Sequence, residues 1–431
     1  MKIHRPLAEA VIRTLHSIFQ ENKYADKVIE KTLKQNPAPG ARQARWGARD
    51  RRFIAETTYD IVRWKRFYRE VSGSQDNDYW TWLAVWIIQH EFQYPQWPEF
   101  DSIHLKQIRT RLLADYPRKI KESIPDWLDD LCGAELGGRW EKELHALNDQ
   151  AHVVLRVNTL KISVKDLAAL LKQDEIETDE LPEFPNALVL RKRQNIFQTE
   201  HFKNGLFEVM DAASQSIARF LMGEGTLSTD GESVPVPPSG LSRVSREGQG
   251  VVRGVRVIDA CAGAGGKTLQ LSALTHNKGK IIALDTEQWK LDELSKRARR
   301  AGAFNIETRM IDSGKVIKRL ENSADRLLLD VPCSGLGVLK RNPDAKWKLS
   351  LEFIERVKEL QQNILNDYCQ MVKVGGLMVY STCSILPSEN EKQIGIFLSQ
   401  HKNQFELEEE KRLWPSDGFD GFYMARMRRK N

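Results

Sequence analysis

Residues 256–268, RVIDACAGAGGKT, join an apolar run that is typical of a buried strand to the start of a helix through a glycine-rich loop. The strand ends at Asp259, and glycines occupy positions 263, 265 and 266. Glycine allows a tight turn and lets a ligand approach the backbone closely. The loop matches neither G-x-G-x-x-G nor the phosphate-binding G-x-x-x-x-G-K-[ST] pattern. By itself it fits a site for a nucleotide-type cofactor and an ordinary tight turn equally well.

Strand-like and helix-like segments alternate from residue 255 onward. Apolar runs predict strands at 256–259, 280–285, 305–311, 326–330, 377–381, 405–409 and 422–427. Helices are predicted at 267–274, 289–300, 351–372 and 389–399. This alternation is typical of βαβ units, so the expected fold class is α/β with a mostly parallel, twisted sheet.

Acidic residues lie at or just after four successive predicted strands, namely Asp259, Asp285, Asp312 and Asp330. Ligands of open α/β sheets bind at the carboxyl ends of the strands. Carboxylates there suit a ligand with ribose hydroxyls, an amino group and a positive centre, as in S-adenosylmethionine, whereas they would repel a dinucleotide pyrophosphate. Some of these acids could instead be helix caps.

The five cysteines are widely spread and include no C-x-x-C pair, which favours neither a disulfide framework nor a zinc site, and no metal is expected. Two of them follow predicted strands: Cys333 in LLLDVPCSG and Cys383 in LMVYSTCS. A lone cysteine in such a place is most often a small buried hydrophobe. Two at the same sheet edge as the glycine loop indicate chemistry.

Methyl transfer to a pyrimidine ring would use such thiols. Carbon C5 of the ring is a poor nucleophile, but attack of a thiolate on C6 makes C5 reactive. A base must then remove the C5 proton before the thiolate leaves. Asp330 is placed to help the ring accept charge near N3 and the amino group.

The first third of the chain predicts a different kind of domain. Residues 1–145 show helical spacing, and they are either a helical bundle without chemistry or an RNA-docking platform. The second interpretation rests on the basic residues Arg42, Arg45, Arg49, Arg51, Arg52, Arg63, Lys65, Arg66 and Arg69, with Trp46 and Trp64 among them. The formal net charge of +6 argues only weakly for nucleic-acid binding.

Three domains are expected in the 431 residues. A small α+β unit follows at 146–210, and the α/β domain covers 211–431. A Gly-, Ser- and Pro-rich run at 223–254 predicts a flexible insertion in it. The N-terminus has no signal-peptide pattern, and no apolar run is long enough for a membrane, so a cytoplasmic protein without a membrane partner is expected.

At its two cysteine motifs the chain resembles the RNA 5-methylcytosine methyltransferases, the bacterial ribosomal-RNA and NOL1/NOP2/sun-type group. The resemblance covers roughly residues 150–431 and is strongest at 330–337 (DVPCSGLG), 341–344 (RNPD), 380–384 (YSTCS) and 420–423 (DGFY). More weakly, residues 25–33 and 49–53 resemble the NusB-like helical domain of the small-subunit ribosomal RNA enzyme.

The resemblance implies a class I methyltransferase fold with a seven-stranded, Rossmann-like sheet, an N-terminal all-helical NusB-like RNA-binding domain and a small RNA-recognition-like unit at 146–210. It also implies S-adenosyl-L-methionine as methyl donor and a cytosine in RNA, most of all 16S ribosomal RNA, as substrate. Cys383 would be the nucleophile, Cys333 would assist release of the product, and Asp330 would complete the catalytic set. The cofactor site would comprise Cys261, Ala262, Gly263, Ala264, Gly265, Gly266, Lys267, Asp285, Asp312 and Asp330. A monomer is expected.

The chain departs from the family pattern in two places. Gly263 and Ala264 replace the usual Ala-Pro of the loop, and the insertion at 223–254 is longer than usual. Alternative functions are a transfer-RNA cytosine-C5 methyltransferase and a non-catalytic RNA-binding ribosome-assembly factor. An exocyclic-amine methyltransferase is disfavoured, because the motif after 330 lacks an aromatic residue. A dinucleotide dehydrogenase would have no use for the second thiol.

Overall fold

The computed structural model describes residues 3–35, 46–223 and 254–431. Arg42, Arg45 and the expected insertion at 223–254, apart from its two end residues, lie outside the described residues. Within these ranges, no helix combines the length and the apolar character needed to cross a membrane. The chain divides into two compact units, Met1–Gln150 with Val338–Ser350, and Ala151–Gly337 with Leu351–Asn431. The domain boundaries near 145 and 210 remain predictions.

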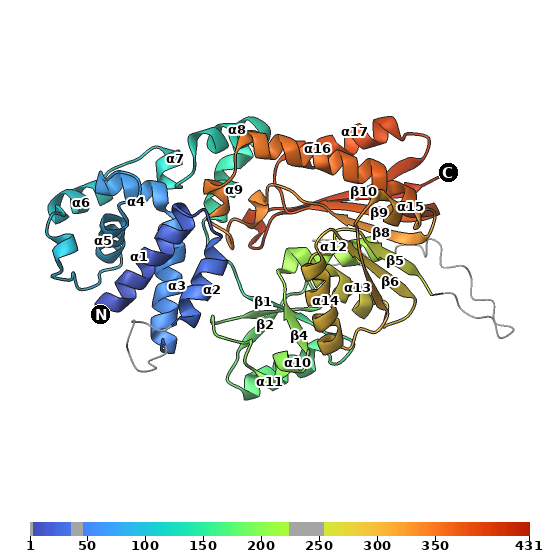
Figure 1. Cartoon of the computed structure of the whole chain (residues 1–431), viewed down its shortest axis with the longest axis horizontal. Coiled ribbons are helices and arrows are strands. Elements are labelled where there is room, and N and C mark those ends of the chain that lie inside the picture. The colour runs from blue at the N-terminus through green and yellow to red at the C-terminus, as the bar shows by residue number, and fades with distance from the viewer. Residues whose placement is uncertain (1–2, 36–45, 224–253) are drawn as a thin grey trace. The chain divides into compact units, whose positions relative to one another are not determined.

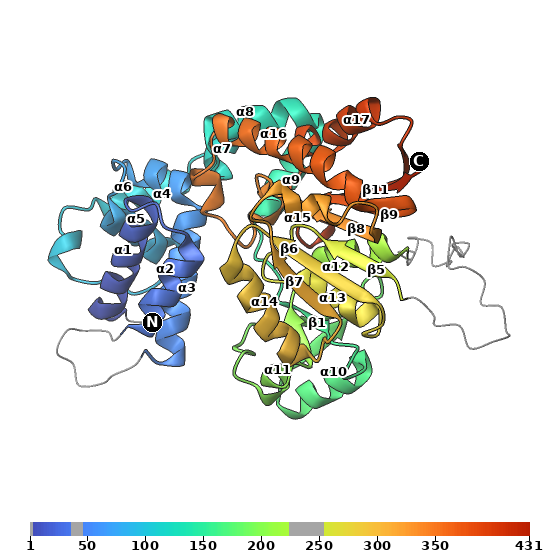
Figure 2. The ribbon, with the colours of Figure 1, turned by 45° about the vertical axis from the view of Figure 1, so that its right-hand side comes forward.

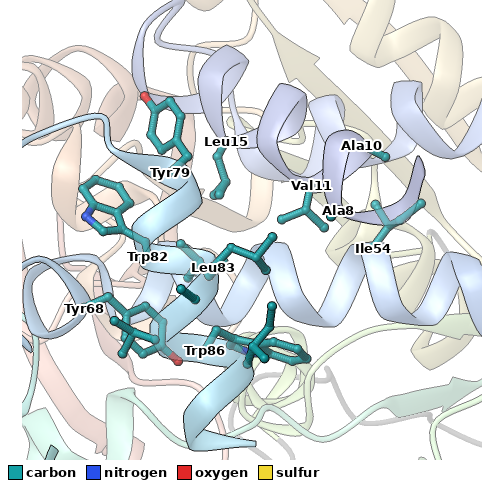
Figure 3. Packing of buried hydrophobic residues seen from close by; sticks show 14 of the residues in the cluster. Ala8, Ala10, Val11, Leu15, Ile54, Tyr68, Tyr79, Trp82, Leu83 and Trp86 are labelled. Carbon is teal, nitrogen blue, oxygen red and sulfur yellow. The ribbon is translucent and has the colours of Figure 1, made fainter. Parts of the chain in front are cut away.

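The first unit is helical, as its sequence periodicity predicts. Its helices are α1 (Arg5–Phe19), α2 (Ala25–Lys34), α3 (Ala48–Arg63), α4 (Lys65–Ser72), α5 (Tyr79–Gln89), α6 (Leu105–Leu112), α7 (Arg118–Lys121), α8 (Asp126–Leu136) and α9 (Trp140–Leu147). Asp78 caps α5 by accepting a hydrogen bond from the Thr81 N–H. Apolar side chains of α1, α3, α4 and α5, including Leu15, Ile54 and Trp82, interdigitate in the core (Figure 3).

A segment from the C-terminal half of the chain completes this unit. Residues 338–350 leave the second unit after Gly337 and pack among the N-terminal helices. The Trp347 indole donates a hydrogen bond to the Val62 carbonyl oxygen at 2.7 Å. Asp344 accepts one from the Ala25 N–H at 3.0 Å. The buried Arg63 guanidinium donates to the Lys340 carbonyl oxygen at 2.8 Å.

Two residues of the proposed RNA-docking set are buried and hold the helical unit together. Trp46 is buried in the helical core, and its indole donates to the Thr32 carbonyl oxygen, so its ring is not available to stack on a base. Arg63 is buried and holds backbone carbonyls. The prediction that Trp46 and Arg63 contact RNA is therefore wrong. Arg49, Arg51 and Arg52, at the start of α3, are exposed.

Residues 151–210 contain a four-stranded antiparallel sheet with two helices. Its strands are β1 (Val154–Val157), β2 (Thr178–Glu180), β3 (Ala187–Leu190) and β4 (Phe207–Val209), in the order β2-β3-β1-β4. The helices α10 (Val164–Gln173) and α11 (Glu200–Lys203) lie on one face of it (Figure 2). The β-α-β-β-α-β succession is that of a ferredoxin-like fold, which confirms the predicted α+β unit.

The rest of the second unit is the predicted seven-stranded α/β sheet. Its order is β10-β11-β9-β8-β5-β6-β7. The strands are β5 (Arg256–Asp259), β6 (Lys280–Asp285), β7 (Ile306–Met310), β8 (Ala324–Asp330), β9 (Val372–Thr382), β10 (Phe405–Leu413) and β11 (Phe422–Arg429). Neighbours among β5 to β9 pair in parallel, and β11 pairs antiparallel with both β9 and β10.

Helices cover both faces of this sheet. On one face lie α12 (Ala212–Met222), α13 (Gly266–Leu274) and α14 (Gln288–Ala301), and on the other α15 (Gly314–Lys318), α16 (Leu351–Tyr368) and α17 (Glu391–Gln400) (Figure 1). Helix α16 ends before the predicted residue 372, because Val372 already pairs with Ala324 at the start of β9.

The strand ends bring the predicted site residues to one edge. Parallel strands place their carboxyl ends on the same side of a sheet. The adjacent strands β6, β5 and β8 end at Asp285, Asp259 and Asp330, and β9 ends one residue before Cys383. The buried apolar residues of these strands, such as Ile258, Leu327 and Tyr380, hold that edge in place.

Candidate active site

The glycine-rich loop has a backbone that only glycine accommodates easily. Gly263 and Gly265 have positive φ angles of 54° and 89°. A Cβ atom on Gly265 would lie 2.0 Å from Cδ1 of Leu294 in α14. The loop therefore packs directly against α14 and then turns into α13 at Gly266.

Two polar contacts fix this loop. Its Gly263 N–H donates to Oδ2 of Asp285 at 2.9 Å, which links the ends of β5 and β6. The Ala264 carbonyl oxygen accepts a hydrogen bond of 2.7 Å from Arg297 in α14. Arg297 also pairs with the buried carboxylate of Glu208 in β4, at 3.0 Å. The predicted cofactor loop is thus braced by the small sheet.

Lys267 and Asp330 form a short ion pair across the β5 and β8 strand ends. The Lys267 Nζ atom lies 2.6 Å from Oδ2 of Asp330, whose Oδ1 accepts a hydrogen bond of 2.9 Å from the Ser381 hydroxyl. Burial lowers the pKa of Lys267, but the charge and hydrogen bond of Asp330, with a smaller effect of Cys383, raise it overall. Lys267 therefore stays charged beside the thiols, and it also lies 5.5 Å from the ring centroid of Phe422.

The two thiols predicted to react together face each other. The sulfur atoms of Cys333 and Cys383 are 3.2 Å apart, and both side chains are partly exposed. Their hydrogen bond, followed by burial, raises the pKa of Cys333 well above its ordinary value. Cys333 therefore keeps its proton at neutral pH, within hydrogen-bond distance of the sulfur of Cys383.

Backbone contacts hold the three motifs of the site together. The Gly337 N–H donates to the Cys383 carbonyl oxygen at 2.8 Å, and the Gly421 N–H donates to the Gly337 carbonyl oxygen at 2.8 Å. A Cβ atom on Gly337 would lie 2.2 Å from the Gly421 carbonyl oxygen. The sequences at 330–337, 380–384 and 420–423 therefore meet in one place.

Asp259 is a buried acid next to these groups. Its Oδ2 accepts a hydrogen bond of 2.6 Å from the Thr268 hydroxyl, while its Oδ1 has no hydrogen-bond partner among the residues that the structure describes. Burial raises the pKa of Asp259 to about 7, against the opposing effect of the Thr268 hydrogen bond. Cys261, two residues on, also has a raised pKa because of burial.

The remaining predicted residues take more peripheral places. Ala262 is buried under the loop, whereas Asp312 is exposed two residues beyond β7 and accepts a hydrogen bond from the Ser313 hydroxyl. In the described ranges, no group of three His, Cys, Asp or Glu residues is arranged to hold a metal ion.

Sequence reasoning missed several residues of the site. Ser381 and Phe422 contact the Lys267–Asp330 pair, and Glu389 lies beneath the two cysteine loops. A signal was present, since the polar residues 388–390 follow a proline and separate a buried strand from a helix. The pattern could not show that Glu389 is fully buried.

This fold and this site define a methyltransferase of the class I type, with two thiols at the edge where the carboxyl ends of the parallel strands meet. The family model described as 16S rRNA methyltransferase RsmB/F matches residues 251–428. The model described as Methyltr_RsmF/B-like, ferredoxin-like domain matches residues 124–197.

Similar proteins extend over most of the chain. The probable ribosomal RNA small subunit methyltransferase B of Bacillus subtilis is 31% identical over 77% of this chain and 70% of its own length. That of Synechocystis is 28% identical over 93% of this chain and 90% of its own length. The crystal structure of a protein named PH0851 has the same fold, with a TM-score of 0.75, 24% identity and 99% of each chain covered.

The chain therefore belongs to the RsmB/F family of 16S rRNA methyltransferases. This membership confirms the predicted family, its class I fold with a helical region and a ferredoxin-like unit, and the enzyme class, an RNA (cytosine-5)-methyltransferase.

Proposed function

We propose that this enzyme transfers a methyl group from S-adenosyl-L-methionine to C5 of a cytosine in 16S ribosomal RNA, through a covalent bond between Cys383 and C6 of the base. The observation that carries the proposal is the pair of sulfur atoms 3.2 Å apart beside the Lys267–Asp330 ion pair. A methyl transfer to an amine or a phosphate oxygen would need neither thiol.

The cofactor edge suits a cationic donor with a ribose. The fully buried Asp259 adds acidic character behind this edge, and the mostly buried Asp285 fits ribose hydroxyls. In this proposal the segment 261–267, with Asp285, Asp312 and Asp330, holds S-adenosylmethionine. When bound, the donor supplies a methyl group without its bonding electrons to a nucleophilic carbon.

The two cysteines then have different tasks. The thiolate of Cys383 bonds to C6, and the electrons of the C5–C6 double bond make C5 nucleophilic. Asp330, held by Lys267 and Ser381, lies at the amino and N3 side of the ring, and the positive charge of Lys267 beside it balances the negative charge that develops there. After methylation a base takes the C5 proton, the double bond forms again, and the electron pair of the C6–S bond returns to Cys383.

Cys333 is the proposed base in the release step. The raised pKa of Cys333 comes first from its hydrogen bond with Cys383. Once Cys383 is bonded to C6, its sulfur no longer shares a proton with Cys333, so the largest cause of the raised pKa is gone, while burial of Cys333 remains. Cys333 can then lose its proton to solvent and accept the C5 proton.

The RNA must present the cytosine unstacked, because a base within a helix cannot be reached by both thiols. We propose that the exposed arginines at the start of α3 contact the phosphate backbone, as in an RNA-docking helical domain. A transfer RNA as substrate is the alternative outcome of the test below.

The test compares two substitutions, with labelled S-adenosylmethionine and either unmodified 16S ribosomal RNA or unmodified transfer RNA as substrate. We expect the wild-type enzyme to label one cytosine at C5, mapped by bisulfite sequencing. Cys383→Ala should abolish labelling and form no covalent complex, because no thiol attacks C6. Cys333→Ala should accumulate a covalent protein–RNA complex that survives denaturing electrophoresis, because release is slow.

Cys369→Ala is the matched control, since this buried cysteine lies away from the sheet edge, at the end of α16. It should behave as the wild type. Labelling of transfer RNA alone would change the substrate class, and an adduct with Cys383→Ala but not with Cys333→Ala would exchange the two roles.

A further inference from the structure

A buried acid lies directly beneath the two reactive cysteines. Glu389 belongs to the short 3-10 turn Pro387–Glu389 between β9 and α17, and its side chain is fully buried. Burying a carboxylate is costly unless several hydrogen bonds compensate for lost water. The hydrogen bonds of Glu389 offset this cost, and they show which segments the carboxylate holds together.

The carboxylate accepts hydrogen bonds from the residues that follow each cysteine. The Ser334 N–H and hydroxyl, just after Cys333, donate to Oε1 and Oε2 at 2.8 and 2.5 Å. The Ser384 hydroxyl, just after Cys383, donates to Oε2. One carboxylate therefore connects both cysteine loops.

A third donor reaches the other side of Cys333. The buried amide of Gln361 in α16 donates to Oε1 of Glu389 at 3.1 Å and to the Pro332 carbonyl oxygen at 3.0 Å. Cys333 is thus held through the residue before it and the residue after it, and both connections lead to Glu389.

The neighbouring Asn390 fixes the Cys383 side in the same way. Its Oδ1 accepts from the Thr382 hydroxyl at 2.6 Å, and its Nδ2 donates to the Ser384 carbonyl oxygen at 3.0 Å. A buried network in which both oxygens of the Glu389 carboxylate are hydrogen-bonded favours one arrangement of its members, because a displacement would leave the charge or a donor unpaired, although Oε1 of Gln361 has no partner among the described residues.

We propose that Glu389 is a positioning residue that sets the distance between the two thiols, acting through Ser334 and Ser384 and not by touching the RNA. The roles of the thiols rest on the proposed function, but the distance between them does not. Displacements of about 1 Å in reacting groups can cost on the order of 100-fold in rate.

The test uses Glu389→Gln, which keeps the size of the side chain but removes its charge and replaces an acceptor by a donor. Glu389→Ala, which removes both carboxylate acceptors, is the stronger variant if it folds. Glu391→Gln is the matched control, because Glu391 is two residues away and pairs with Arg412 at the surface. Thermal denaturation checks that each variant is folded.

The first measurement needs no RNA. Diamide oxidises two neighbouring thiols to a disulfide and takes up their two hydrogens, and it does so rapidly only where the sulfur atoms can approach to about 2 Å. We expect Glu389→Gln to form the Cys333–Cys383 disulfide about 10-fold more slowly than wild type and Glu391→Gln, measured by mass spectrometry. The alkylation rate of Cys383 in a Cys333→Ala background should be unchanged, and that of Cys333 in a Cys383→Ala background should not fall, because the charge of Glu389 is one of the causes that raise the pKa of Cys333.

The second measurement is steady-state kinetics. We expect kcat of Glu389→Gln to fall by about 10- to 100-fold, with the KM values for RNA and methyl donor within about twofold of wild type. Wild-type disulfide rates and wild-type kcat in Glu389→Gln would overturn the inference. Failure of the proposed function would show differently, as a wild-type enzyme that forms no adduct while the effect on disulfide rates persists.

Discussion

At the scale of single residues, the fold controls charge most clearly at Asp259. Burial at the end of β5 raises its pKa to about 7, so the carboxyl exchanges a proton near neutral pH. The charge of the cofactor edge then changes with pH, while the neighbouring Lys267 stays positive. The pKa of Cys333 is likewise raised by its surroundings, first by the hydrogen bond with Cys383 and then by burial.

The raised pKa predicts that Asp259 makes the free energy of unfolding depend on pH. Between about pH 4 and pH 7 the folded protein holds a proton on Asp259 that the unfolded chain releases, so the stability conferred by this group falls as pH rises and levels off above about 7. Asp259→Asn should remove this contribution and gain stability relative to wild type from pH 5 to pH 8, on the order of a few kcal/mol.

Urea denaturation of the ligand-free protein at several pH values measures this difference. Asp130→Asn, at an exposed position of α8, is the control and should run parallel to wild type. Parallel curves for Asp259→Asn and wild type would contradict the prediction.

At the scale of elements, the loop from β5 to α13 and helix α14, which packs against it, act together. The positive φ of Gly265 and its contact with Leu294 set the path of the loop, and Arg297 of α14 ties its Ala264 carbonyl to Glu208 of the small sheet. Neither the loop nor α14 can shift without the other.

Gly265→Ala should therefore destabilise the second unit by about 1–3 kcal/mol, because the new Cβ combines backbone strain with a clash. Gly395→Ala is the matched control: it lies inside α17, where a Cβ meets nothing within 4 Å. Helix propensity predicts a gain of about 0.5–1 kcal/mol there. Equilibrium unfolding of both variants checks the opposite signs, and equal effects would refute the argument.

At the scale of the whole molecule, the chain crosses between its two compact units more than once. The segment 338–350 begins five residues after Cys333 and returns at α16, but its side chains belong to the helical unit. The Trp347 indole and the Asp344 carboxylate form hydrogen bonds with the N-terminal helices that these helices would otherwise lack.

Trp347→Phe should loosen this unit, because the Val62 carbonyl loses its indole donor, at a cost of about 1 kcal/mol. Since about 1 kcal/mol corresponds to a roughly fivefold change in the opening equilibrium, hydrogen–deuterium exchange in the core of α3 should become roughly fivefold faster. Trp289→Phe, at an exposed tryptophan of α14, should leave this exchange unchanged. Unchanged exchange in Trp347→Phe would show that the segment contributes nothing there.

Sequence reasoning succeeded where a local pattern determines the outcome. The apolar runs ending at Asp330 and near Cys383 predicted strands, and since β8 and β9 are neighbours their ends meet. It could not foresee pairings that depend on strand order, such as Lys267 with Asp330 across β5 and β8. Burial of polar or amphipathic residues was equally hidden, because Glu389 and Trp46 resemble surface residues until the fold encloses them.

The place of β11 in the sheet has a consequence for biosynthesis. This strand lies between β9 and β10, although it is made after both. A nascent polypeptide that has emerged from the ribosome only as far as β10 leaves the long, apolar edge of β9 uncovered, and such edges invite aggregation. A premature stop codon between these strands would therefore yield a polypeptide that depends on chaperones, even though every cysteine and acid discussed above has already been translated.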